Sequence, residues 1–223
     1  SIRFAATYDP EVDEGLSEVV AREDFAWIDD APPPGASTSG TGDFVRAPDH
    51  PVKLGRSALR IEAKGLMQKV IEANGPKLKV GKGDSLFAHV YIDPKNPPKE
   101  IMLQWKIGGE WARRAYWGDN AIDWGKDGTT ERLRIDDLPP DGEWARLEVP
   151  ASRLEIAPGT VIEGWAFTLF DGVVYFDESG LRTSTPQEGR SYDNLTAWIR
   201  ARVADDGAGL PDELKAILKK PRA

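Results

Sequence analysis

Residues 161–181, VIEGWAFTLFDGVVYFDESGL, carry the clearest signal for the class of fold. Residues 161–170 and 173–181 are two mainly apolar runs, rich in the aromatic and β-branched side chains that favour strands. Asp171-Gly172 stands between them, and an Asp-Gly pair between two such runs is typical of a two-residue hairpin turn. We therefore predict two adjacent strands joined by a hairpin.

A similar strand-like pattern recurs toward the N-terminus, where turn-rich stretches separate short runs of alternating apolar and polar residues. Gly65 is expected to end one strand and to make the next run its hairpin partner. Residues 29–52, rich in Pro, Gly, Ser and Thr, are expected to be loop. We expect further strands at residues 58–63, 67–71, 86–92, 101–107, 111–117, 131–135 and 143–149. Many short strands at this spacing indicate a mainly β fold, a β-sandwich of jelly-roll type.

The chain divides into an N-terminal segment or linker, a jelly-roll domain and a helical tail, at residues 1–24, 25–185 and 186–223. An edge strand, a linker and a helix all remain open for the acidic first segment. In the tail, Leu195, Trp198 and Val203 recur at helical spacing, so we expect a short C-terminal helical appendage. Trp198 is expected to pack this appendage against the sandwich.

Composition excludes several classes of site and partner. The 223 residues include no cysteine, which rules out disulfides, thiolate metal sites and cysteine nucleophiles. The net charge of −8 argues against sequence-independent binding to nucleic acid or to an anionic membrane. No apolar run approaches about 18 residues, so we expect no membrane insertion. Because the chain begins at Ser1 without an apolar leader, we expect it to be a piece of a longer protein.

The familiar catalytic templates are missing from the sequence. The two histidines, His50 and His89, have neither metal-site nor triad spacing, and no GxSxG, P-loop, GxGxxG or HExxH motif occurs. Acidic residues are abundant, but solvated loop charges are the favoured interpretation for them. We predict that the chain is not an enzyme, and a polysaccharide hydrolase or lyase is the weaker alternative.

The distribution of tryptophan points to a ligand surface. Four of the eight tryptophans fall in one twenty-residue window, together with arginine and tyrosine. Sugar rings can stack their apolar faces on indole rings, and their hydroxyls need donors such as arginine. The candidate ligand-binding residues are Trp105, Trp111, Arg113, Arg114, Tyr116, Trp117 and Trp124.

Two interpretations of this tryptophan cluster stay open: at least one exposed ring stacks on a saccharide, or all of the rings fill the core. In an unbroken strand Trp111, Arg113 and Trp117 share one face, and Arg114 and Tyr116 point the other way. Two other tryptophans outside the window, Trp144 and Trp165, are expected in the core.

The segments LGRSALRIEA, VGKGDSLFAHVYI, DGEWARLEVP and IEGWAFTLFDGVVYFDESGL, in this order, resemble galactose-binding-like jelly rolls, the group that holds many carbohydrate-binding modules. In that group an Asp of the last strand commonly binds a structural Ca²⁺ with oxygens of the N-terminal segment. The resemblance implies Asp177 as a calcium ligand, with Glu23 and Asp24 as its partners, and hard oxygen ligands suit this ion. The alternative is that Asp177 is only a turn residue.

A second resemblance covers residues 25–183 and is carried by WIDDAPPPGA, VGKGDSLFAHVYIDPKNPPKEIMLQW, RRAYWGDNAIDWGKDGT and LPPDGEWARLEVP. These segments look like a region of large planctomycete proteins with cytochrome c, PSCyt2 (DUF1549) and PSD1 (DUF1553) domains. The family pattern WEHRAYWG departs here at Ala112 and Arg113, so no role of those two family residues carries over. The resemblance implies an extracytoplasmic (periplasmic or secreted) cytochrome-linked accessory module. Without a CxxCH motif, this segment holds no haem.

Together, the residues and the resemblances predict a non-catalytic carbohydrate-binding module that stacks a polysaccharide or oligosaccharide on surface aromatics. Its other expected partners are the neighbouring domains of the parent chain. An arginine-rich site would suit acidic or sulfated sugars, because their charge is complementary. The alternative function is a structural or docking domain without a ligand.

Overall fold

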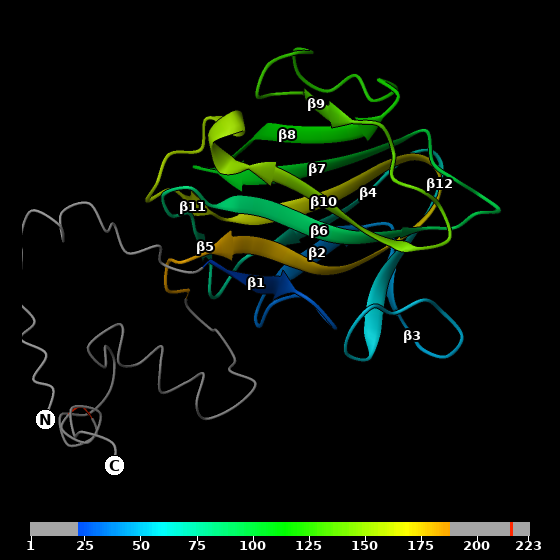
Figure 1. Cartoon of the computed structure of the whole chain (residues 1–223), viewed down its shortest axis with the longest axis horizontal. Helices are drawn as coiled ribbons and strands as arrows, with labels where there is room; N and C mark the ends of the chain where they lie inside the picture. The colour runs from blue at the N-terminus through cyan, green and yellow to red at the C-terminus, as the bar shows by residue number, and fades with distance from the viewer. Residues whose placement is uncertain (1–21, 188–214, 216–223) are drawn as a thin grey trace, which may run out of the picture.

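The computed structural model describes residues 22–187 and Lys215 (Figure 1). The expected helical tail with Trp198, and most of the N-terminal segment, lie outside these residues. Within them no helix is long and apolar enough to cross a membrane. The elements are β1 (Glu23–Ile28), β2 (Ser37–Gly40), β3 (Asp43–Arg46), β4 (Ser57–Glu72), β5 (Leu78–Lys79), β6 (Ser85–Ile92), β7 (Glu100–Ile107), β8 (Glu110–Gly118), β9 (Leu133–Asp136), β10 (Trp144–Pro150), the 3-10 helix η1 (Ala151–Leu154), β11 (Val161–Ile162) and β12 (Gly164–Thr183).

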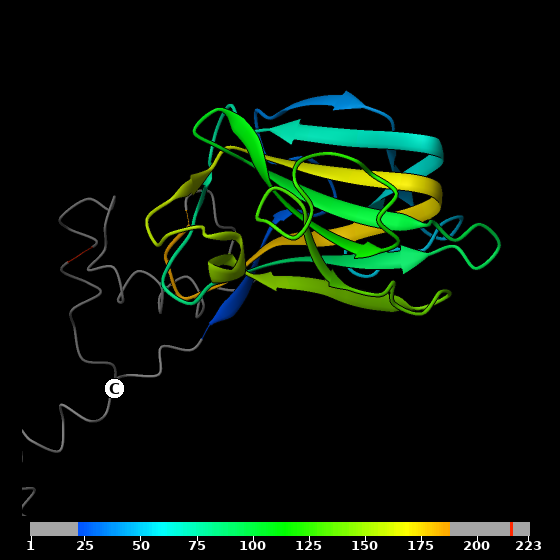
Figure 2. The same cartoon turned by 90° about the horizontal axis from the view of Figure 1, so that it is seen from above.

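These strands form a β-sandwich whose two layers share two long strands, which confirms the predicted class of fold. The β7–β8 sheet has the order β2, the C-terminal half of β4, the N-terminal half of β12, β7, β8 and β9. The β6–β10 sheet has the order β3, the N-terminal half of β4, the C-terminal half of β12, β6 and β10. Figure 2 shows the two layers one above the other, with β4 and β12 curving between them at one end.

The predicted hairpins at Gly65 and at Asp171-Gly172 are wrong, because β4 and β12 each continue through these positions. The two strands pair with each other along both halves, and the register shifts between Phe170 and Gly172. Gly65, Asp171 and Gly172 have φ values of 71°, 60° and 81°. Positive φ suits a β-bulge as well as a hairpin turn, so the sequence signal was real but its geometry was misassigned.

A hydrogen bond between the two strands ties their bends together. The Gly65 N–H donates to Asp171 Oδ1 at 2.7 Å, and Lys99 Nζ lies 3.0 Å from the other oxygen of this carboxylate. The backbone hydrogen bond and the lysine both hold the pKa of Asp171 below its ordinary value. The acid therefore stays ionised at neutral pH and fixes the place where both strands turn.

The prediction that residues 29–52 are all loop is also wrong, since β2 and β3 lie within them. Both pair antiparallel with β4 at the edge of their sheets, and every residue of β2 is exposed. The edge of β4 has backbone N–H and C=O groups that need partners, and the backbone of β2 and β3 supplies them. The polar side chains of β2 alone would not have predicted a strand.

The core lies between the layers and is filled by alternate side chains of each strand. Trp105 and Trp165 are fully buried and meet edge to face, with ring centroids 5.2 Å apart. Phe167 and Phe176, on the two halves of β12, meet at 4.5 Å. The prediction that Trp165 belongs to the core is confirmed.

Gly172→Ala should destabilise the domain far more than Gly65→Ala. A Cβ at Gly172 would collide with Pro98 N and lie 2.6 Å from the Pro97 carbonyl carbon, whereas a Cβ at Gly65 meets nothing within 4 Å. Both changes pay the cost of positive φ, of the order of 1 kcal/mol. Urea unfolding followed by tryptophan fluorescence measures the difference. Equal losses for the two variants would show that the contact with the Pro97-Pro98 segment does not hold the bend.

Candidate functional site

The outer face of the β7–β8 sheet carries a row of hydrogen-bonded polar side chains from four strands, which we call the polar ladder. Gln68 Nε2 of β4 and Gln104 Nε2 of β7 both donate to Thr168 Oγ1 of β12, at 3.1 and 2.7 Å. Arg114 Nε of β8 donates to Gln104 Oε1 at 2.8 Å. Thr168 and Gln104 are buried, while Gln68 and Arg114 are half-buried. The ladder therefore presents its two ends to the surface.

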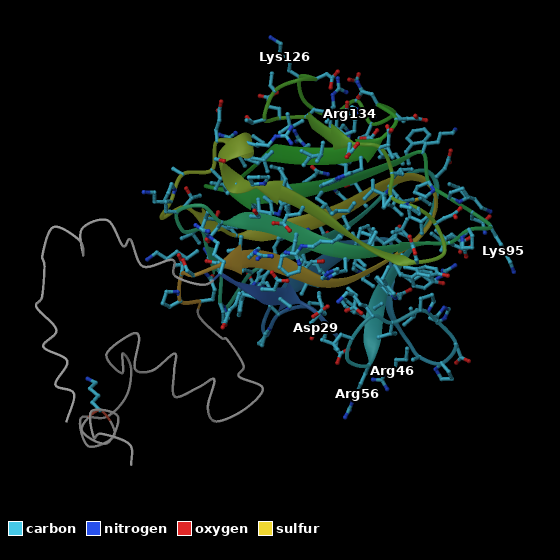
Figure 3. All side chains as sticks on the ribbon, in the orientation of Figure 1. Asp29, Arg46, Arg56, Lys95, Lys126 and Arg134 are labelled. Atoms are coloured by element: carbon cyan, nitrogen blue, oxygen red, sulfur yellow. The ribbon has the colours of Figure 1, made fainter. Side chains whose placement is uncertain are left out.

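The loop of residues 119–132 covers one side of this face. Tyr116 and Met102 are buried beneath it with Ile122, and the half-buried Trp124 packs against this cluster. Tyr116 Oη donates to Asp127 Oδ1 at 3.2 Å. The tip of the loop, where Figure 3 labels Lys126, rises above β8 and β9. The loop thus holds Trp124 beside the ladder.

Trp111 lies at the other side of the ladder, beyond Lys106. A Cβ added at Gly164 would be 3.0 Å from Trp111 Cη2 and 3.2 Å from Lys106 Cβ, so the indole ring rests on this glycine. The prediction that Trp111 shares a face with Trp117 is wrong. A register shift in the pairing of β7 with β8, between Trp105 and Ile107, breaks the alternation.

Four of the seven predicted ligand-binding residues cannot offer a ring or a charge to this face. Trp105 and Trp117 are 0% and 4% exposed and belong to the core, so the expectation that they stack on a ligand is wrong. Tyr116 is 2% exposed under the loop, and its ring is likewise closed to a saccharide. Arg113 pairs with the inward-facing Trp105 and so points away from the ladder. The structure brings together Trp111, Arg114 and Trp124.

Glu100, which the sequence did not single out, fastens the loop. Its Oε2 accepts hydrogen bonds from the backbone N–H groups of Ala121 and Ile122, at 2.6 and 2.8 Å. The residue is fully buried, and its Oε1 has no hydrogen-bond partner among the described residues. Burial raises the pKa of Glu100 to about 7, against the lowering effect of the two N–H groups and of Arg132. The sequence offered one signal for this role of Glu100. A carboxylate stands directly before Ile101, at the start of a mainly apolar strand.

Glu100→Gln should make the stability of the domain less dependent on pH. Glu100 has a higher pKa in the folded protein, about 7, than the usual value of 4.5. The folded state therefore loses stability as the pH rises from about 4.5 through about 7. That difference corresponds to roughly 3 kcal/mol, whereas glutamine keeps the acceptor and does not ionise. Denaturant unfolding of both proteins between about pH 4 and pH 8 measures it. Parallel pH curves would show that Glu100 is not the titrating group.

The predicted calcium ligands are only partly brought together. Asp177 Oδ2 accepts from the backbone N–H groups of Lys53 and Leu54, at 2.8 and 3.2 Å. Asp24 instead accepts hydrogen bonds from Arg146 at 2.7 and 3.1 Å. In the register of β1 with β12 it lies opposite Arg182, five residues along β12 from Asp177. Glu23 lies opposite Thr183, one residue further away. The expectation that Glu23 and Asp24 join Asp177 in one metal site is therefore wrong.

The acidic residue of the N-terminal region that interacts with Asp177 is Asp29, in place of Glu23 and Asp24. It follows β1, at the base of the arm that holds β3 (Figure 3). Burial, followed by the charges of Asp177, Asp30 and Glu178, raises the pKa of Asp29 to about 6. Its Oδ1 is buried without a hydrogen-bond partner in the described part of the chain. No group of three or more acidic or histidine side chains with metal-site geometry occurs among the described residues. Two facing carboxylates with an unpartnered oxygen fit a cation completed by backbone or water oxygens, and they also fit a shared proton.

Comparison with known proteins adds structural neighbours. No family model and no curated protein sequence matches the chain. Carbohydrate-binding modules of the β-sandwich superfamily are similar in structure. One covers 72% of this chain with a TM-score of 0.44 and 15% identity, and the match spans 63% of that module's chain, less than two thirds.

Two further neighbours have a TM-score of 0.38 and 13% identity. TmCBM61, solved with β-1,4-galactotriose, matches over 66% of this chain and 88% of its own. The glycoside hydrolase domain of Endo-D from Streptococcus pneumoniae R6 matches over 69% of this chain and 22% of its own. Similarity at this level assigns no ligand and no residue role to this chain.

Proposed function

We propose that this domain is a non-catalytic carbohydrate-binding module that holds a saccharide on the outer face of the β7–β8 sheet. The observation that carries the proposal is the placement of two half-buried indole rings, Trp111 and Trp124, on either side of the polar ladder. The rings suit the apolar faces of sugar units, and Arg114 and Gln68 suit their hydroxyls.

The ladder supports binding because its side chains are held in place by one another. Arg114 is held by Gln104 and by the Glu131 carbonyl, at 2.8 and 3.0 Å, so its remaining N–H groups have a fixed direction. Fixing donors in advance lowers the entropy cost of binding. Arg114 contributes a positive charge to the ladder itself, whereas the charge of the neighbouring Lys106 is offset by Glu72 at 2.7 Å. The charge of Arg114 favours acidic or sulfated sugars over neutral ones.

Two other functions compete with this one. A structural or docking domain would use the same rings to contact a neighbouring domain, and a hydrolase or lyase would need a catalytic pair on this face. The extracytoplasmic, cytochrome-linked setting is also part of the proposal. Its support is the planctomycete resemblance of the sequence.

Trp124→Ala should weaken saccharide binding by about tenfold or more, as expected when a central aromatic contact is removed. Affinity electrophoresis through gels that contain β-1,4-galactan, xylan, hydroxyethyl cellulose, polygalacturonate or carrageenan measures the retardation of each variant. Arg114→Ala should weaken binding most in the two acidic gels.

Arg113→Ala is the matched control, since Arg113 lies on the same strand, is equally half-buried and points to the other side of the sheet. It should migrate as the wild type does. If the wild type is not retarded by any of the five polysaccharides, the proposed function is wrong.

We also propose that Asp29 and Asp177 hold a structural Ca²⁺. A cation between them would offset the repulsion that raises the pKa of Asp29, and it would give the unpartnered Asp29 Oδ1 a partner. The ion would fix the end of β1 to the C-terminal half of β12. It would supply cohesion rather than catalysis.

Calcium should raise the unfolding temperature of the wild type at about pH 7.5, and by less at about pH 5, where a proton competes for Asp29. Asp29→Asn should abolish the response, and Asp24→Asn should keep it, because Asp24 is paired with Arg146. Differential scanning calorimetry with Ca²⁺ and with chelator measures both. An equal response in the two variants would place the ion elsewhere.

A further inference from the structure

The outer face of the β6–β10 sheet carries a second line of aligned side chains, which we call the aromatic row. Its members come from four adjacent strands: Arg60 of β4, Tyr175 of β12, Tyr91 of β6 and Trp144 of β10. Each is the direct register partner of the next. The row therefore crosses the sheet at right angles to the strands, about 14 Å from end to end at the usual strand spacing.

The prediction that Trp144 is a core residue is wrong, and this error reveals the row. Trp144 is half-buried and pairs with Tyr91, whose neighbours Val90 and Ile92 are the residues that point into the core. The Tyr91 and Trp144 ring centroids are 5.8 Å apart, and those of Tyr91 and Tyr175 are 5.9 Å apart. His50, from the loop after β3, continues the line at 5.9 Å from Tyr175.

The hydrogen-bonding groups of the row are partly paired, and those of Tyr91 and Trp144 are open. Arg60 Nη2 donates to Glu62 at 2.8 Å, and the buried Tyr175 has its Oη 3.3 Å from His50 Nδ1. Within residues 22–187 no hydrogen bond is made by Tyr91 Oη or by Trp144 Nε1. Open donors beside half-buried aromatic rings suit a ligand that combines acceptor oxygens with apolar faces.

We propose that the aromatic row is a second saccharide-binding site, on the face opposite the polar ladder. Sugar hydroxyls can accept from Arg60, Tyr91 and Trp144, while sugar C–H faces lie against the Tyr91 and Trp144 rings. A protein partner fits less well. The large exposed apolar residues in the described part of the chain are Leu54, Leu66 and Val161, and none belongs to the row.

This second site extends the proposed function from one face to two. The layers of a sandwich lie about 10 Å apart, so two separate glycan chains would be held on opposite sides of one domain. Such a domain would cross-link polysaccharide, which a domain with one site cannot do.

The test uses the whole chain and the same five polysaccharides. Trp144→Ala and Tyr91→Ala should each weaken retardation by about tenfold while leaving part of it, and combining Trp144→Ala with Trp124→Ala should abolish it. Light scattering of a dilute polysaccharide solution should rise with added wild type and stay flat with either tryptophan variant. Tyr91→Phe, which removes only the hydroxyl, should give a smaller loss and covers the case in which an alanine variant unfolds.

Arg46→Ala is the control, because Arg46 lies on β3 of the same sheet, outside the row and near the tip of its arm (Figure 3). If Trp144→Ala, Tyr91→Ala and Tyr91→Phe all match Arg46→Ala while Trp124→Ala abolishes binding, the second site is wrong and the first stands. If Trp124→Ala changes nothing while Trp144→Ala abolishes binding, the row is the site and the ladder is not. A wild type that no polysaccharide retards would overturn both.

Discussion

The shared bend of β4 and β12 is the constraint on which the rest of the fold depends. One hydrogen bond, from the Gly65 N–H to the Asp171 carboxylate, marks the point where both strands leave one layer and enter the other. Because the strands remain paired on either side of it, both sheets are built around the same two-stranded ribbon. The polar ladder lies on one half of this ribbon and the aromatic row on the other. A change in the angle of the bend would shift the two faces together.

The sequence was informative about strands and misleading about connections. The alternation in residues 86–92 and 101–107 corresponds closely to β6 and β7, because one face of each strand is apolar and packs into the core. A Gly or Asp-Gly with positive φ can reverse a chain or bend it, and only the partner strand decides which. β2 and β3 carried too little apolar pattern to be found, since their pairing with β4 comes from backbone groups rather than from side chains.

The same limits explain the candidate site. Tryptophan density located the right strand, β8, and strict alternation placed Arg114 and Tyr116 correctly on one face. Alternation failed at Trp111, where a register shift turned the ring. It could not predict the exposure of Tyr116 and Trp124, because that depends on a loop whose residues Ala121 and Ile122 are bonded to Glu100. Trp144 was assigned to the core because it begins an apolar strand, although its register partner Tyr91 decides the side. Burial of an aromatic ring follows from tertiary neighbours that no local pattern contains.

The antiparallel pairing of β1 with the last part of β12 has a mechanical consequence. Glu23 lies opposite Thr183, so the chain enters and leaves the domain side by side at one end of the sandwich. A force that drew these two points apart would act across the strands and break their hydrogen bonds one after another, as a zipper opens. The opposite arrangement would load all of those bonds at once in shear. The domain is thus built to yield first at its attachment, by release of β1, while the ribbon of β4 and β12 bears little of the load.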